Sequence, residues 1–132
     1  MPITYTIDHA RRLVVAEAHG TLTDDETFGY QREVWSRADV AGYNELVDMT
    51  HVTYIALPSS ERVRDLARYS ASMDAAEPAS KMAIVAPGDL AFGLGRMYAT
   101  NRAMNTQSTK HVSVFRTRAA ALEFLGLSEP SS

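Results

Sequence analysis

The chain has 132 residues, 45% of them hydrophobic, which is the size and composition of a single domain with its own core. It has no cysteine, so disulfides, thiolate metal sites and a cysteine nucleophile are excluded. Its formal net charge is −3 and charges of both signs are interleaved, so no broad positive field attracts a phosphate backbone and we expect no nucleic-acid partner.

The amino-terminal segment has neither the basic cluster nor the apolar stretch of a signal peptide. No later stretch approaches the ~20 apolar residues that span a bilayer. We therefore expect a soluble cytoplasmic protein that is not integral to a membrane.

The first third of the chain is predicted to form a hairpin and a helix. Residues 3–7 alternate between apolar side chains and threonine, and the apolar run 13–18 supplies a partner strand. Thr23 and Glu26 form a capping box, which marks the start of a helix that ends before Gly42. The expected face of this helix contains Phe28, Gln31, Trp35 and Ala38.

The middle of the chain is predicted to contain a short buried strand at Leu46-Val47, followed by an irregular stretch over 49–57. A second helix should start at Ser59-Ser60 and stop at Pro78. Its buried stripe is expected to contain Val63, Leu66, Ala67, Ser70 and Met73. The apolar run 82–86 is typical of a strand covered on both faces.

Near the carboxyl terminus, Asp89 is expected to cap a third helix and residues 112–115 to form the last strand. Thr117 should cap a final helix that ends at Gly126 in a Schellman arrangement. We expect a single domain over 1–127 and a frayed tail over 128–132.

These elements predict an α/β domain of the order ββαβαβαβα, with a mostly parallel five-stranded sheet and four helices. This order, the aliphatic strand 46–49 that contains Asp48, the helix 92–98 and the ending 114–126 together resemble the SpoIIAA-like (STAS-like) family, in an uncharacterised branch. The resemblance covers nearly the whole chain. It implies a SpoIIAA-like fold and a function in binding rather than catalysis.

In the anti-sigma-factor-antagonist branch of STAS proteins, a serine at the start of the second helix is phosphorylated, in an Asp-Ser-Ser-Gly-like context, to control partner binding. The resemblance places Ser59 and Ser60 in the comparable region, between Leu57-Pro58 and Glu61-Arg62. The flanking Asp and Gly are therefore absent. A phosphate there would meet free N–H groups and the helix dipole, although serine at this position is also an ordinary helix cap.

Asp48, Asp89 and Thr117 follow three predicted parallel strands, at the edge where open α/β sheets bind ligands. Capping alone can account for Asp89 and Thr117, whereas Asp48 has no evident local role. Gly93 and Gly95 lie within a predicted helix, so they do not form a dinucleotide loop, and close packing of that helix is the alternative.

The four histidines (His9, His19, His51 and His111) show no metal-ligand spacing, and we expect no metal site and no cofactor. No Gly-x-Ser-x-Gly elbow or Walker loop is present, and we expect no enzymatic activity. A small-substrate enzyme that uses Asp48 and Arg96 is a third hypothesis.

We therefore interpret the chain as a non-catalytic binding or regulatory module that contacts a protein or a small apolar molecule. The alternative is a phosphoswitch at Ser59 or Ser60. A homodimer is a further expectation, because small α/β domains often cover an exposed edge by pairing. The expected ligand or partner surface contains Asp48, Ser59, Ser60, Asp89, Phe92, Arg96 and Tyr98.

Overall fold

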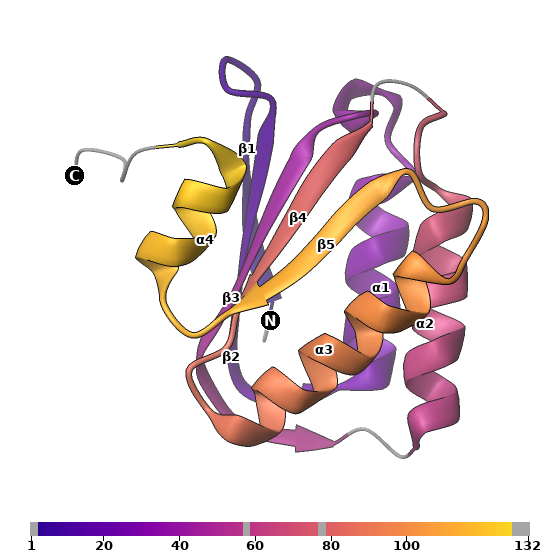
Figure 1. The fold of residues 1–132 in the computed structure, drawn as a ribbon. Helices are drawn as coiled ribbons and strands as arrows, with labels where there is room; N and C mark the ends of the chain where they lie inside the picture. The colour runs from indigo at the N-terminus through magenta and orange to yellow at the C-terminus, as the bar shows by residue number, and fades with distance from the viewer. Residues whose placement is uncertain (1–2, 57–58, 77–78, 128–132) are drawn as a thin grey trace.

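The structure, a computed structural model, describes residues 3–56, 59–76 and 79–127. They form β1 (Ile3–Asp8), β2 (Leu13–Thr23), α1 (Asp24–Trp35), a 3-10 helix η1 (Ala38–Val40), β3 (Asn44–Ala56), α2 (Ser60–Ser72), β4 (Ser80–Val85), α3 (Asp89–Ala103), β5 (Lys110–Phe115) and α4 (Arg118–Leu125). The predicted order ββαβαβαβα is confirmed (Figure 1). The expected tail at 128–132 and the predicted helix stop at Pro78 lie outside the described residues.

All five strands form one sheet in the order β1-β2-β3-β4-β5. β1 pairs with β2 in antiparallel register, and every later pair is parallel, as the sequence predicts. The parallel strands follow chain order without a reversal, so right-handed crossovers place α1, α2 and α3 on the same face of the sheet. Figure 1 shows these three helices together on one face and α4 on the other.

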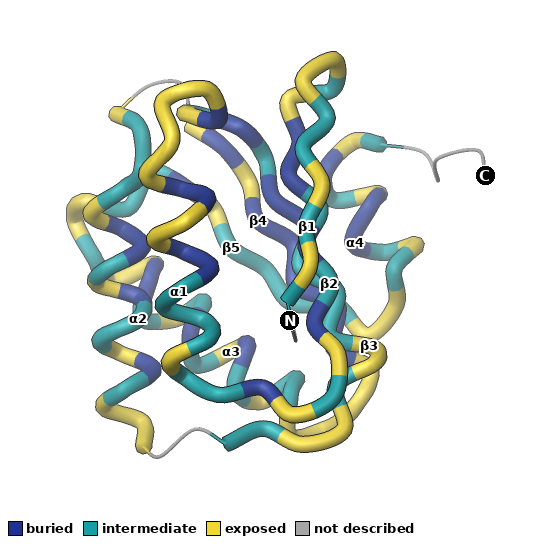
Figure 2. The backbone as a smooth tube through the Cα atoms, turned by 180° about the vertical axis from the view of Figure 1, so that it is seen from behind, coloured by how far each residue is buried: buried dark blue, intermediate teal, exposed yellow. Residues whose placement is uncertain are grey.

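The sheet therefore has two differently covered faces. Under α4, the large side chains Leu13 and Leu46 pack against Leu122 and Leu125 in a closed core. On the other face, the apolar side chains divide into one cluster beside α1 and another beneath α2 and α3. Figure 2 shows the buried positions concentrated along the strands and on the inward sides of the helices.

Three predicted helix caps are confirmed. The hydroxyl oxygens of Thr23, Ser59 and Thr117 each accept a hydrogen bond from the N–H group three residues later, at 3.2–3.3 Å. α4 ends at Gly126, where φ is +73° and the Leu127 N–H donates to the Leu122 carbonyl as in a Schellman motif.

The predicted cap of the third helix is wrong by one residue. Gly88 occupies the N-cap of α3 without a side-chain bond, and Asp89 is the first helical residue. Its carboxylate still lies in the first turn, where the helix dipole favours negative charge, and it pairs with Arg116 at 2.7 Å. An acidic residue beside an N-cap gives much the same sequence signal as one at the N-cap.

The predicted irregular stretch after Asp48 is also wrong, because β3 continues to Ala56. Its second half pairs with the second half of β2, which runs to Thr23, after register shifts near Gly20. Beyond Asp48 the strand has no ladder with β4, and many of its side chains are exposed. The apolar alternation that identifies a half-buried strand is therefore missing there.

Helix α1 is shorter than predicted, since it ends at Trp35 and Ala38 belongs to η1. Gln31 and Trp35 lie on its buried face as expected, together with Tyr30 and Val34. Phe28 instead packs against Tyr69 of α2, with ring centroids 5.8 Å apart.

The two glycines of α3 have different surroundings. A Cβ atom added at Gly95 would lie 3.2 Å from both methyl groups of Val114 on β5, so this helix approaches the sheet too closely for a larger residue without adjustment. At Gly93 a Cβ would meet nothing within 4 Å. The close-packing alternative is confirmed for Gly95 alone.

Candidate functional site

The helix-covered face of the sheet contains an apolar cavity of about 110 Å³ that is partly open to solvent. Strands β1 to β4 and helices α1, α2 and α3 all contribute to its wall. On β2 the wall includes two small side chains, Ala16 and Ala18, besides Leu22, and larger residues at the two alanine positions would fill the space. Val47, Ile84 and Leu94 are among the aliphatic side chains that surround them, and none of the described wall residues is charged.

Four wall residues carry polar side-chain groups, and three of these groups are engaged elsewhere. The Thr27 hydroxyl donates to the Asp24 carbonyl at 2.7 Å, and the Tyr30 hydroxyl donates to a Glu45 carboxylate oxygen at 2.7 Å. The third hydroxyl, that of Tyr98, lies 2.6 Å from the Ser70 hydroxyl.

The fourth polar group is the side-chain amide of Gln31. This residue is 6% exposed, and its side chain forms no hydrogen bond within the described part of the chain. Among those residues no fully enclosed side-chain nitrogen or oxygen lacks a partner, so the amide keeps some accessible surface. Because Gln31 borders the cavity, its amide is within reach of a molecule held there.

Asp48 lies on the opposite face of the sheet, under α4. Its carboxylate accepts hydrogen bonds from the Thr50 backbone N–H at 2.9 Å and from the Arg118 guanidinium at 2.9 Å. Burial disfavours the charged form, but the bonds from Thr50 and Arg118 outweigh it, and the pKa of Asp48 lies below its ordinary value. These contacts give Asp48 the local structural role that its sequence context does not show.

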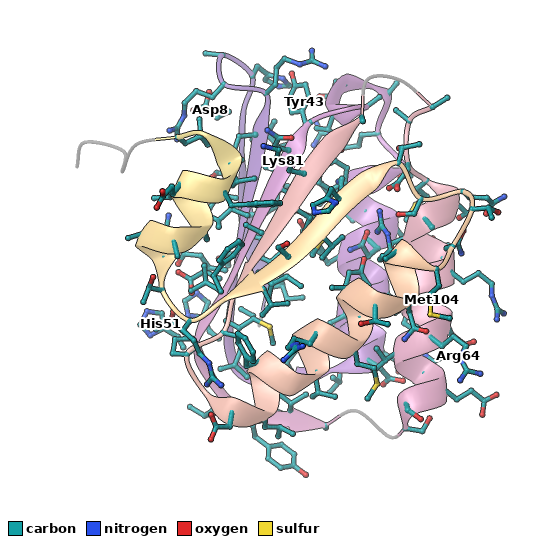
Figure 3. All side chains as sticks on the ribbon, in the orientation of Figure 1. Asp8, Tyr43, His51, Arg64, Lys81 and Met104 are labelled. Atoms are coloured by element: carbon teal, nitrogen blue, oxygen red, sulfur yellow. The ribbon has the colours of Figure 1, made fainter. Side chains whose placement is uncertain are left out.

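A pair of histidines lies near this end of the sheet. The rings of His19 and His51 are stacked with centroids 5.6 Å apart, and the register of β2 and β3 places them opposite each other. Figure 3 shows the His51 side chain at the outer margin of the molecule. Among the residues that the structure describes, no three metal-ligating side chains come together.

Asp89, Phe92 and Arg96 form a second, separate group at the start of α3. Arg116 from β5–α4 links two of them, because it pairs with Asp89 and lies over the Phe92 ring at 4.0 Å from its centroid. Arg96 is exposed on the same helix, beside a shallow hollow between α3 and β5. Asp48 contacts α4 while Arg96 belongs to α3, so the two residues of the enzyme hypothesis lie on opposite faces of the sheet.

Ser59 and Ser60 are exposed at the start of α2. The Ser59 hydroxyl already caps the helix by accepting from the Arg62 N–H. The Arg62 guanidinium is in turn held by Asp24 of α1 at 2.7 Å. Phosphorylation of either serine stays a prediction.

Tyr98 is buried at 6% exposure, so it lies inside the fold and not on the outer surface with the other predicted residues. Its hydroxyl accepts from Arg102 at 2.9 Å, and Arg102 forms a fully buried pair with Asp74. Burial raises the pKa of the Tyr98 phenol, although the nearby Arg102 acts in the opposite direction. The contribution of Tyr98 is to the cavity wall.

The sequence does not reveal a second buried ion pair, between Glu45 and Lys110. Their side chains are 2% and 5% exposed, and the Lys110 ammonium lies 3.3 Å from a Glu45 oxygen and 3.3 Å from the centroid of the Trp35 ring. Burial lowers the pKa of Lys110, against the opposing effect of Glu45. Burial likewise raises the pKa of Tyr30 well above 10, and the Glu45 charge adds to this.

The predicted surface is thus divided among several places. Asp48 lies under α4, the two serines at the start of α2, Asp89 with Phe92 and Arg96 along α3, and Tyr98 in the core. The strands β2 to β5 show no reversal of order, so the sheet has no topological switch point, which is the feature that opens a strand-end crevice in α/β folds. The apolar cavity lies instead between the sheet and helices α1, α2 and α3.

A solved structure from Shewanella loihica PV-4, described as an uncharacterized protein from the DUF3478 family with a SpoIIAA-like fold, is similar to this chain. The similarity covers 93% of both chains at a TM-score of 0.56 and 16% sequence identity. The predicted SpoIIAA-like fold is therefore confirmed. No protein-family model and no curated protein matches the sequence. Within the described residues, no helix is long and apolar enough to cross a membrane.

Proposed function

We propose that the protein is a non-catalytic binding module for a small apolar molecule held between the sheet and helices α1, α2 and α3. The observation that carries this proposal is the cavity of about 110 Å³ with an almost entirely hydrocarbon wall. An apolar cavity of about 150 Å³ in another protein stays dry and binds benzene, so this space suits a compact molecule of similar or slightly smaller size. A larger ligand could extend into the neighbouring hollow between β1 and α1, which shares Ile3 and Tyr30 with the cavity.

The energetics favour occupation. At about 24 cal/mol per Å³, an empty apolar cavity of this volume lowers the free energy of unfolding by roughly 2–3 kcal/mol relative to a filled one. Water cannot offset this cost, because a buried water needs two to four polar partners and the wall offers at most one free amide. An apolar ligand regains dispersion contacts with the wall and avoids its own exposure to water.

Benzene is a direct probe of this proposal. We expect it to raise the midpoint of thermal unfolding, because a ligand that binds only the folded state stabilises it. In methyl NMR spectra, benzene should shift the resonances of Ile84 and Leu94 in the cavity wall, and not those of Leu13 and Leu46 on the α4 face.

The matched variants are Ala18→Leu, which fills the cavity from β2, and Ala119→Leu, which adds the same atoms at an exposed position of α4. Ala18→Leu should abolish the benzene response and Ala119→Leu should retain it. Absence of any benzene-induced shift in the wild-type protein, or an equal response in both variants, would contradict a binding function at this cavity.

A further inference from the structure

The polar groups of the cavity wall show what kind of molecule the cavity would accept. The hydroxyl groups of Thr27, Tyr30 and Tyr98 are bonded within the protein, whereas the Gln31 amide has no partner among the described residues. This amide keeps some accessible surface and has no protein partner among the described residues, so it is available to a molecule in the cavity. An occupant with one polar group can bond to it.

We propose, building on the binding function above, that the ligand is an uncharged molecule with an apolar body and one hydroxyl or carbonyl group, and that the Gln31 amide recognises this group. An amide offers both a donor and an acceptor, so it can bond either a hydroxyl or a carbonyl. Gln31 projects from the middle of the buried face of α1, between Thr27 one turn before it and Val34 after it. This position places Gln31 at the border of a hydrocarbon space.

The charges around the cavity argue against a carboxylate ligand. None of the described wall residues is a cation, and the buried cations nearby are already paired, Arg102 with Asp74 and Lys110 with Glu45. The Glu45 carboxylate lies directly behind Tyr30, so a second negative charge in the cavity would be repelled as well as desolvated. Burying an unpaired carboxylate costs far more than burying a hydroxyl that is hydrogen-bonded.

Three probes that share one aromatic ring test the role of the Gln31 amide and the restriction to uncharged ligands: benzene, phenol and benzoate. They are titrated at pH 7 into the wild-type protein and into Gln31→Leu, which keeps the approximate volume and removes the amide. We expect Gln31→Leu to bind benzene like the wild type and to bind phenol about tenfold more weakly, the loss expected when a buried hydroxyl has no partner. Benzoate should bind the wild-type protein more weakly than phenol.

The unfolding midpoint of the ligand-free protein gives a second readout. Replacing an unpartnered buried amide by leucine should raise this midpoint, whereas a Gln31 that is bonded within the protein would lower it when replaced. Gln31→Met provides the same comparison should the leucine variant not fold.

The outcomes distinguish this inference from the binding function on which it rests. Failure of benzene to bind the wild-type protein contradicts the binding function itself. Benzene binding with an unchanged ratio of phenol to benzene affinity in Gln31→Leu leaves that function standing and overturns the role of Gln31. Benzoate that binds the wild type as tightly as phenol overturns the restriction to uncharged ligands.

Discussion

The substitution Lys110→Met tests whether the buried ion pair between Glu45 of β3 and Lys110 of β5 stabilises the fold. Tyr30 and Trp35 of α1 donate hydrogen bonds to the same Glu45 carboxylate. Methionine keeps much of the aliphatic stem of lysine and removes the ammonium group. Glu45 would keep the hydrogen bonds from Tyr30 at 2.7 Å and Trp35 at 3.2 Å, but would lose its positive partner at 3.3 Å. Both partners are at least 95% buried, so we expect the free energy of unfolding at pH 7 to fall by about 3–5 kcal/mol.

The companion variants are Glu45→Gln and the double variant. Burial already lowers the pKa of Lys110, so this side chain can become neutral when its partner is removed, and we expect Glu45→Gln to cost less than Lys110→Met. The double variant contains no buried charge at this point. Its cost should therefore be smaller than the sum of the two single costs by about 1–3 kcal/mol.

Urea unfolding, followed by circular dichroism and by the fluorescence of Trp35, measures these differences. Trp35 is the only tryptophan and contacts Lys110 directly, so circular dichroism provides the probe that is independent of the substitution. Lys81→Met is the matched control, because Lys81 is the other lysine and is exposed, and it should change stability by less than about 0.5 kcal/mol. A Lys110→Met variant as stable as the wild type, or single costs that simply add, would refute the reasoning.

Three further predictions concern stability. Burial raises the pKa of Tyr30, so the contribution of this residue to the free energy of unfolding is complete below about pH 10 and is lost as the pH rises towards the folded-state value. Tyr30→Phe should therefore flatten the alkaline decline of stability in a pH series of urea titrations, with the exposed Tyr54→Phe as control. The pKa of Asp48 is lowered, so the contribution of this residue to the free energy of unfolding is present above about pH 4 and is lost below it. Asp48→Asn should therefore flatten the loss of stability at acid pH. An unchanged acid profile in this variant would contradict the role of Asp48. Gly93→Ala should stabilise the protein by about 1 kcal/mol. Gly95→Ala should be the less stable of the two variants, because the added Cβ atom would contact both methyl groups of Val114. Equal unfolding midpoints of the two variants would contradict the close approach of α3 to the sheet.

Local sequence signals predict the architecture well because each depends on neighbouring residues only. Thr23, Ser59 and Thr117 cap their helices through groups three residues away, and Gly126 ends α4 through its own backbone conformation. Alternation identifies β1 because one of its faces is partly buried. Where neither condition holds, as in the second half of β3, the sequence carries no equivalent signal.

The candidate site could not be predicted to the same extent, because it depends on which residues the fold brings together. Gln31 is on the expected face of α1, but only the structure shows that this face borders a cavity and that the amide has no partner in the described residues. Asp48 and Arg118 are 70 positions apart in the chain, and Lys110 and Glu45 are 65 apart. A prediction of the strand order would have helped, since an unreversed order places three helices on one face and removes the strand-end crevice.

The three helices above the cavity are fixed by polar contacts along their inner edges. Arg62 of α2 holds Asp24 of α1 at 2.7 Å, and Ser70 of α2 lies 2.6 Å from Tyr98 of α3. The bond from Tyr30 to Glu45 then fastens α1 to the sheet. For α1 to sink onto the small side chains beneath, the buried bond from Tyr30 to the Glu45 carboxylate would have to break, and a broken buried bond to a charged group costs about 1.5–3 kcal/mol.

This cost is comparable with the roughly 2–3 kcal/mol that closing the cavity would recover, so collapse brings little or no net gain. The α4 face differs, because the large side chains Leu13 and Leu46 occupy the space beneath that helix. A ligand between α1, α2 and α3 therefore adds contacts without moving any helix. This is the physical reason to place the proposed binding function inside the fold, at Ala16, Ala18 and Gln31, instead of at the ends of its strands.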